Sequence, residues 1–132
     1  MKVVALDFGA ARTGVAVSDP TGTIARPLGV VERAATDDGL RRVVEIVREH
    51  EAERVVVGLP LTLRGEHGDQ ARETDAFVRA LRAALDVPVE SYDERFTTGL
   101  AAADESADAP EDARAAAHLL STYLAWKSPA AE

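Results

Sequence analysis

Residues 5–19, ALDFGAARTGVAVSD, decide the fold of this chain. An apolar run that begins at Val3 leads into one carboxylate, Asp7, and a second valine-rich run follows the glycines Gly9 and Gly14. Runs of β-branched residues separated by glycine predict two adjacent strands. A carboxylate at the end of a buried strand is costly unless it is paired or binds a cation, so Asp7 is a candidate functional residue. The glycines keep side chains away from the space beside it, which suits the approach of a phosphate or metal.

The composition predicts a single domain over residues 1–132 in the cytoplasm. No apolar run approaches the roughly 18 residues that span a membrane, and no signal-peptide pattern opens the chain. The absence of cysteine excludes disulfides and thiolate chemistry. The net charge of −8 argues against a broad phosphate-binding surface. Carboxylates that recruit cations, with a few arginines around them, could still hold nucleic acid.

Eight elements are predicted along the chain. Three strands come first, in a meander, and Pro27 places the third strand at an edge of the sheet or at a bend. Helices and strands then alternate, with helical spacing of apolar residues in each of the three helices. This β-β-β-α-β-α-β-α order predicts an α/β fold with a mixed five-stranded sheet and helices on both faces. The predicted strands are 1–7, 14–18, 23–31, 54–58 and 87–92, and the helices begin near residues 36–38, 71 and 111.

Three acidic residues occupy comparable positions in this order. Asp7 ends the first strand, Glu94 follows the last strand, and Asp112 begins the last helix. The helical spacing places Asp112 on the inward stripe, with Ala115 and Ala116 as small neighbours that let the helix pack close to the sheet. Carboxylates gathered in this way require a cation, and oxygen ligands select Mg²⁺ or Mn²⁺. Two such ions about 3.5–4 Å apart can activate water for phosphodiester hydrolysis.

Each acid also has a structural interpretation. Asp7 alone could be a hydrogen-bonded buried aspartate, and Glu94 could pair with Arg95 at the surface. Asp112 could be a helix N-terminal acid stabilised by the helix dipole. The joint placement of all three favours the metal site.

Candidate phosphate contacts surround the three acids. Arg12, Arg64 and Arg95 could clamp phosphates, although a solvated side chain or a local ion pair is an equal alternative for each. Gly9 and Gly58 adjoin the strand ends, where backbone could approach a ligand closely.

Four motifs in order resemble the YqgF (RuvX) family of RNase H-like nucleases over nearly the whole chain. They are Asp7-Phe8-Gly9-Ala10-Ala11-Arg12-Thr13-Gly14 with Ser18-Asp19; Val57-Gly58-Leu59-Pro60-Leu61 with Gly65 and Gly68; Asp93-Glu94-Arg95-Phe96-Thr97-Thr98 with Ala101; and Asp112 with Ala115-Ala116, Leu119-Leu120 and Tyr123-Leu124.

The resemblance implies an RNase H-like fold similar to that of Holliday-junction resolvases. It implies a nuclease associated with maturing the 5′ end of pre-16S ribosomal RNA, with Asp7, Glu94 and Asp112 as the acidic triad that binds metal. We therefore expect a divalent-metal-dependent nuclease with Mg²⁺ or Mn²⁺ as cofactor. Its expected partner is nucleic acid, either an rRNA precursor or branched or single-stranded DNA. A homodimer is also possible.

The chain departs from the family pattern in residues 102–111, which are short and acidic where relatives are usually longer and basic. This departure motivates a second hypothesis, a non-catalytic module that binds nucleic acid or ribosome precursors. A third hypothesis takes Asp7, Gly9 and Gly14 as the phosphate element of an actin-like kinase. That fold needs two such halves around a nucleotide, and this chain is too short for both.

Overall fold

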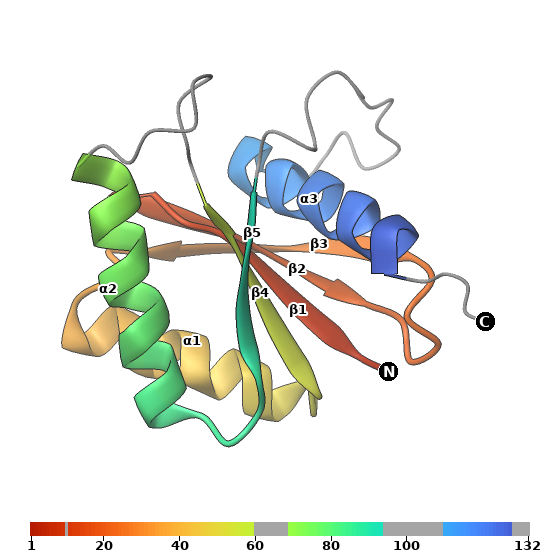
Figure 1. The fold of residues 1–132 in the computed structure, drawn as a ribbon, viewed down its shortest axis with the longest axis horizontal. Coiled ribbons are helices and arrows are strands. Elements are labelled where there is room, and N and C mark those ends of the chain that lie inside the picture. The colour runs from red at the N-terminus through yellow and green to blue at the C-terminus, as the bar shows by residue number, and fades with distance from the viewer. Residues whose placement is uncertain (10, 60–68, 94–109, 128–132) are drawn as a thin grey trace.

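The structure is a computed structural model that describes residues 1–9, 11–59, 69–93 and 110–127. These residues form five strands and three helices in the predicted order (Figure 1). The elements are β1 (Val3–Asp7), β2 (Arg12–Ser18), β3 (Ala25–Glu32), α1 (Asp37–Glu49), β4 (Arg54–Leu59), α2 (Asp69–Ala84), β5 (Val89–Asp93) and α3 (Glu111–Lys127).

The strands form one mixed sheet in the order β3-β2-β1-β4-β5. β1 pairs antiparallel with β2, and β2 pairs antiparallel with β3. β1 pairs parallel with β4, which pairs parallel with β5. The predicted mixed five-stranded sheet is therefore confirmed, and the carboxyl ends of β1, β4 and β5 meet at one edge, where ligands gather in sheets of this kind.

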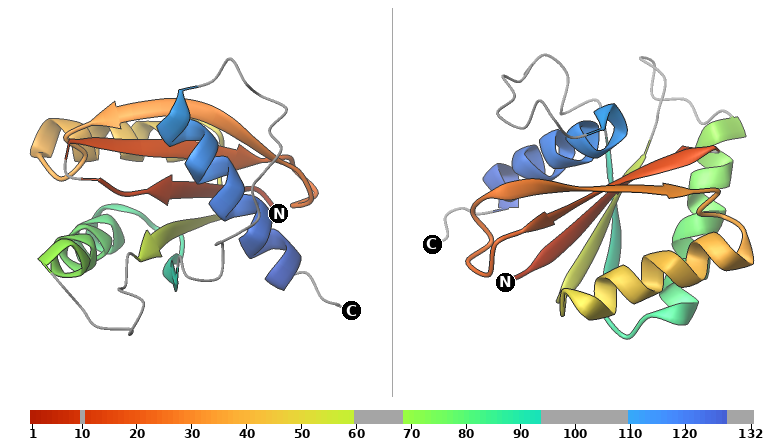
Figure 2. Two further views of the ribbon diagram at one scale, coloured as in Figure 1. Left: turned by 90° about the horizontal axis from the view of Figure 1, so that it is seen from above. Right: turned by 180° about the vertical axis from the view of Figure 1, so that it is seen from behind.

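Alternating side chains divide the core between the two faces of the sheet. Val4 and Leu6 of β1 pack in the cluster that contains the apolar residues of α1 and α2. Val3 and Ala5 pack instead in the cluster under α3, which includes Leu120. Figure 2 shows α3 on one side of the strands and α1 and α2 on the other. Helices on both faces were predicted, and the structure confirms them.

The edge position predicted from Pro27 is confirmed, because β3 is the outermost strand. The pairing with β2 also shifts there, from Val15 opposite Gly29 to Ala16 opposite Pro27, which leaves Leu28 as an extra residue in a bulge. Proline has no N–H to donate, and a bulge interrupts the ladder, so this edge is poorly suited to pairing with another strand.

No helix in the described part of the chain is long and apolar enough to cross a membrane.

Candidate active site

Asp7 lies on the face of the sheet that α3 covers. Val3 and Ala5 pack under α3, and side chains alternate along a strand, so Asp7 is directed to the same face. The next residue, Phe8, points the other way, where its ring stacks on Phe77 of α2 with a centroid distance of 4.6 Å. Asp7 is half-buried. It is thus held between a tightly packed strand and the helix that carries the second acid.

Gly14 brings Asp112 to this place. Gly14 is paired with Asp7 across β1 and β2. A Cβ built on Gly14 would lie 1.8 Å from the carbonyl oxygen of Asp112, which is far inside any tolerated contact. The start of α3 therefore packs directly on the backbone of β2. The register of β1 and β2 then places the main chain of Asp112 beside the strand pair that ends at Asp7.

Arg12 forms an ion pair with Asp112. Its Nε lies 3.1 Å from Oδ2 of the carboxylate, and the Arg12 side chain is 65% exposed while that of Asp112 is 35% exposed. Arg12 was predicted as a phosphate clamp, with a local ion pair as the equal alternative, and the structure shows the ion pair. Sequence spacing gave no signal for this partner, because the two residues lie at opposite ends of the chain.

The predicted inward stripe of the last helix is correct in most positions but wrong at Ala115. Ala115 is exposed, whereas Ala113 and Ala116 are buried and provide the small surface that faces the sheet. The centre of the buried face is thus rotated away from the predicted stripe. Asp112 consequently lies at the margin of the buried face, where Arg12 reaches it, rather than at its centre.

The third predicted acid, Glu94, lies outside the described residues, as do Arg95 and Arg64. β5 ends at Asp93, whose main chain pairs with Leu59 at the end of β4. Within the described ranges no three His, Cys, Asp or Glu side chains are grouped so that they could hold a metal. The structure places the main chain of Asp112 against Gly14, the residue that pairs with Asp7, and carboxylate oxygens suit a hard divalent cation.

The two predicted binding glycines have backbone roles in the structure. The N–H of Gly9 donates to Thr13 Oγ1 at 3.4 Å, and a Cβ on Gly9 would meet the carbonyl oxygen of Arg12 at 2.5 Å. Gly58 is buried in β4 and pairs with Tyr92. The expectation that Gly9 and Gly14 leave room for a ligand is corrected, because the chain itself fills the direction of a Cβ at both positions.

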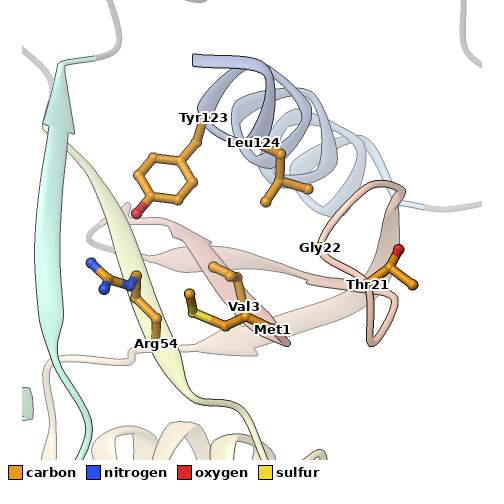
Figure 3. Close-up of a pocket in the computed structure, with 7 residues that line it drawn as sticks. All are labelled: Met1, Val3, Thr21, Gly22, Arg54, Tyr123 and Leu124. Atoms are coloured by element: carbon orange, nitrogen blue, oxygen red, sulfur yellow. The ribbon is translucent and has the colours of Figure 1, made fainter. Parts of the chain in front are cut away.

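A separate hollow of about 250 Å³ lies at the other end of β1, away from Asp7 (Figure 3). Tyr123 of α3 and Arg54 of β4 line it, and Glu90 joins them: it pairs with Arg54 and accepts a 3.1 Å hydrogen bond from the Tyr123 hydroxyl. Burial, followed by the nearby Glu90 carboxylate, raises the pKa of Tyr123 to about 12. This cluster ties α3 to β4 and β5 and lies outside the candidate site.

The family model described as "RuvX: Holliday junction resolvase" matches residues 1–126. A protein of Syntrophomonas wolfei named "Putative pre-16S rRNA nuclease" is 37% identical over 132 residues, which cover 94% of each chain. A protein of the same name from Chloroflexus aggregans is 46% identical over 96 residues, which cover 73% of this chain and 68% of that protein.

Solved structures support the same fold. Thermus thermophilus RuvC in complex with a Holliday junction substrate superposes with a TM-score of 0.68 at 19% identity, covering 100% of this chain and 98% of RuvC. A second structure of the T. thermophilus protein gives a TM-score of 0.58 at 24% identity and covers 96% of both chains. The predicted RNase H-like architecture is confirmed by these superpositions.

Proposed function

We propose that this chain, which belongs to the RuvX family through the match over residues 1–126, is a divalent-metal-dependent nuclease. Its substrate would be pre-16S rRNA, in keeping with the names of its relatives, with cleavage at the 5′ end, and branched or single-stranded DNA is a second substrate to test. We place it in the cytoplasm as a single domain.

The observation that carries this proposal is the placement of Asp7 and Asp112 on one face, at the carboxyl end of β1. The Asp7–Gly14 register and the contact of Gly14 with the main chain of Asp112 support this placement. A site built on packed backbone holds its side chains more precisely than a site built on loops. We therefore expect the two carboxylates to be held near each other before a ligand binds.

Asp7 and Asp112 would hold Mg²⁺ or Mn²⁺, together with Glu94 as the third ligand. When bound, the cation supplies an activated water and neutralises charge that develops on the phosphate during hydrolysis. The two aspartates supply the negative charge that attracts it. Ala5 and Ala16 of the β1–β2 pair are fully buried under α3 on the same face as Asp7, and they would exclude water from the sheet side of the site.

Arginines would position the phosphate backbone. Arg12 is the described candidate, and its guanidinium is largely exposed at the margin of α3. Arg64, Arg95 and Gly58 complete the proposed substrate-binding set. Planar guanidinium groups suit phosphate because they donate two parallel hydrogen bonds.

The test is cleavage of two labelled substrates, an RNA that spans the 5′ end of pre-16S rRNA and a four-way DNA junction. Each is incubated with the protein in Mn²⁺, in Mg²⁺ and in excess chelator. We expect products with either ion and none with chelator, and the preferred substrate identifies the reaction. Binding of both nucleic acids without products in any condition would support the alternative, a non-catalytic module that binds ribosome precursors.

A further inference from the structure

We infer that Arg12 is the internal counter-cation of Asp112, which a divalent cation must displace, and that the released guanidinium then binds a nucleic-acid phosphate. This inference rests on the proposed function, because it takes Asp112 to be a metal ligand. It adds that one arginine couples the two binding events.

The geometry of the pair supports displacement. Nε of Arg12 lies 3.1 Å from Oδ2 of Asp112, so the guanidinium occupies an oxygen that a cation would use. The Arg12 side chain is 65% exposed. Exposed ion pairs are weak because water screens them and because ordering the long side chains costs entropy. Arg12 can therefore neutralise Asp112 when no metal ion is bound and still be displaced when a metal ion binds.

The other described ion pairs differ from this one. Arg41 pairs with Asp38 at 2.9 Å within one turn of α1, which lies on the opposite face of the sheet from α3 (Figure 2). Arg54 and Glu90 join two neighbouring strands and are less exposed. The Arg12–Asp112 pair, by contrast, links β2 to α3 and uses a carboxylate of the candidate site.

Coupling follows from this arrangement. A guanidinium held by Asp112 has lost part of its attraction for phosphate, and a carboxylate held by Arg12 has lost part of its attraction for metal. A metal ion bound to Asp112 frees Arg12 for phosphate, and a phosphate bound to Arg12 frees Asp112 for metal. Thermodynamic linkage requires the two binding events to strengthen each other by the same factor. Metal binding should therefore strengthen nucleic-acid binding through Arg12.

The first experiment is a Mn²⁺ titration of the protein alone, with free Mn²⁺ followed by electron paramagnetic resonance. Arg12→Gln should bind Mn²⁺ about two- to fivefold more tightly than wild type, the change expected from removing an exposed ion pair. The matched control is Arg41→Gln, because Arg41 is 66% exposed and also pairs with an aspartate. It should bind Mn²⁺ as wild type does, and Asp112→Asn should bind it more weakly.

The second experiment measures binding of a labelled single-stranded RNA against salt concentration, in chelator and in Mn²⁺, with gel electrophoresis confirming that the RNA stays intact. In Mn²⁺, Arg12→Gln should lower the salt slope by about 0.7, the value for one lost phosphate contact on a single strand. In chelator Arg12→Gln should lower the slope by less than this, because the wild-type guanidinium is partly held by Asp112 there. A purely structural role for Arg12 would not produce a slope that depends on metal.

Three results would overturn the inference, and they separate its failure from that of the proposed function. If wild type binds Mn²⁺ and Arg12→Gln binds it with the same affinity, Arg12 does not compete with the metal ion for Asp112. That result rejects the inference and leaves the proposed function intact. An equal change of salt slope with and without Mn²⁺ makes Arg12 a permanent phosphate contact. No Mn²⁺ binding by wild type, or wild-type binding by Asp112→Asn, rejects the proposed metal site and the inference together.

Discussion

Gly14 lies directly against the main chain of Asp112, so closely that a Cβ on Gly14 would be 1.8 Å from the Asp112 carbonyl oxygen. The same glycine pairs with Asp7 on the neighbouring strand. A single residue without a side chain therefore links the main chains of the two aspartates of the candidate site.

Gly14→Ala should move the start of α3 away from β2. Because backbone rather than a flexible side chain faces the new methyl group, we expect a loss of about 1–3 kcal/mol in the free energy of unfolding. We also expect weaker Mn²⁺ binding. Urea unfolding and the Mn²⁺ titration measure the two effects. The control is Gly29→Ala in β3, where nothing lies within 4 Å of the added Cβ. Equal stability of the two variants would contradict the packing argument.

Asp7→Asn should abolish cleavage while the protein stays folded. The amide has nearly the volume of the carboxylate but lacks the charge that holds a cation. Loss of an outer-shell partner already costs about 10–100-fold in metalloenzymes, so loss of a direct ligand should cost more than about 100-fold. Cleavage assays at saturating Mn²⁺ and a thermal melt measure both properties, with the exposed Asp86→Asn as control. Full activity of Asp7→Asn in saturating Mn²⁺ would reject the assignment.

Tyr123 should make stability fall at alkaline pH. Its pKa is raised from 10.0 to about 12 by burial and by the Glu90 carboxylate, so the folded protein holds this proton more tightly than the unfolded chain. The stabilisation is complete below pH 10.0 and is lost as the pH rises towards about 12. We expect the urea midpoint of wild type to fall more steeply across this window than that of Tyr123→Phe. Parallel curves would show that another group governs the alkaline loss.

Asp19 should contribute to stability at neutral pH and lose that contribution in acid. The N–H of Ile24, the hydroxyl of Thr21 and the N–H of Thr23 donate to its carboxylate at 3.0, 2.5 and 2.8 Å, and they hold its pKa well below the usual 3.8. Stability from this turn is present above pH 3.8 and is lost as the pH falls through the lowered pKa. Asp19→Ala should unfold at a lower urea concentration than wild type at neutral pH, and the difference should shrink in acid. A constant difference at every pH would show that charge is not the cause.

Local patterns predicted the elements well. In α1 the apolar residues Leu40, Val43, Val44 and Val47 recur at helical spacing, and Thr36 accepts from the N–H of Gly39 at its start. The continuous apolar run of β4 indicated a strand buried on both faces, and Val55, Val56 and Val57 are fully buried. Such patterns depend on neighbours along the chain, which the sequence displays directly.

The site was harder to predict because it depends on contacts between the ends of the chain. The start of α3 is rich in alanine, so its apolar stripe is poorly defined and its rotation was misjudged at Ala115. No pattern of neighbouring residues connected Arg12 to Asp112. None showed that the space beside Gly14 is filled by the main chain of Asp112 and not left for a ligand. These are long-range contacts, and composition does not specify them.

The contact between Gly14 and Asp112 also has a consequence for synthesis of the protein. β1 and β2 are made first, whereas α3 is the last described element of the chain. Gly14 and Asp112 are separated by most of the sequence, and domains generally fold as units. A nascent chain that does not yet include α3 therefore contains Asp7 but not Asp112. Such a fragment cannot bring Asp112 against Gly14, so the candidate site forms only once α3 has been synthesised and has packed on the sheet.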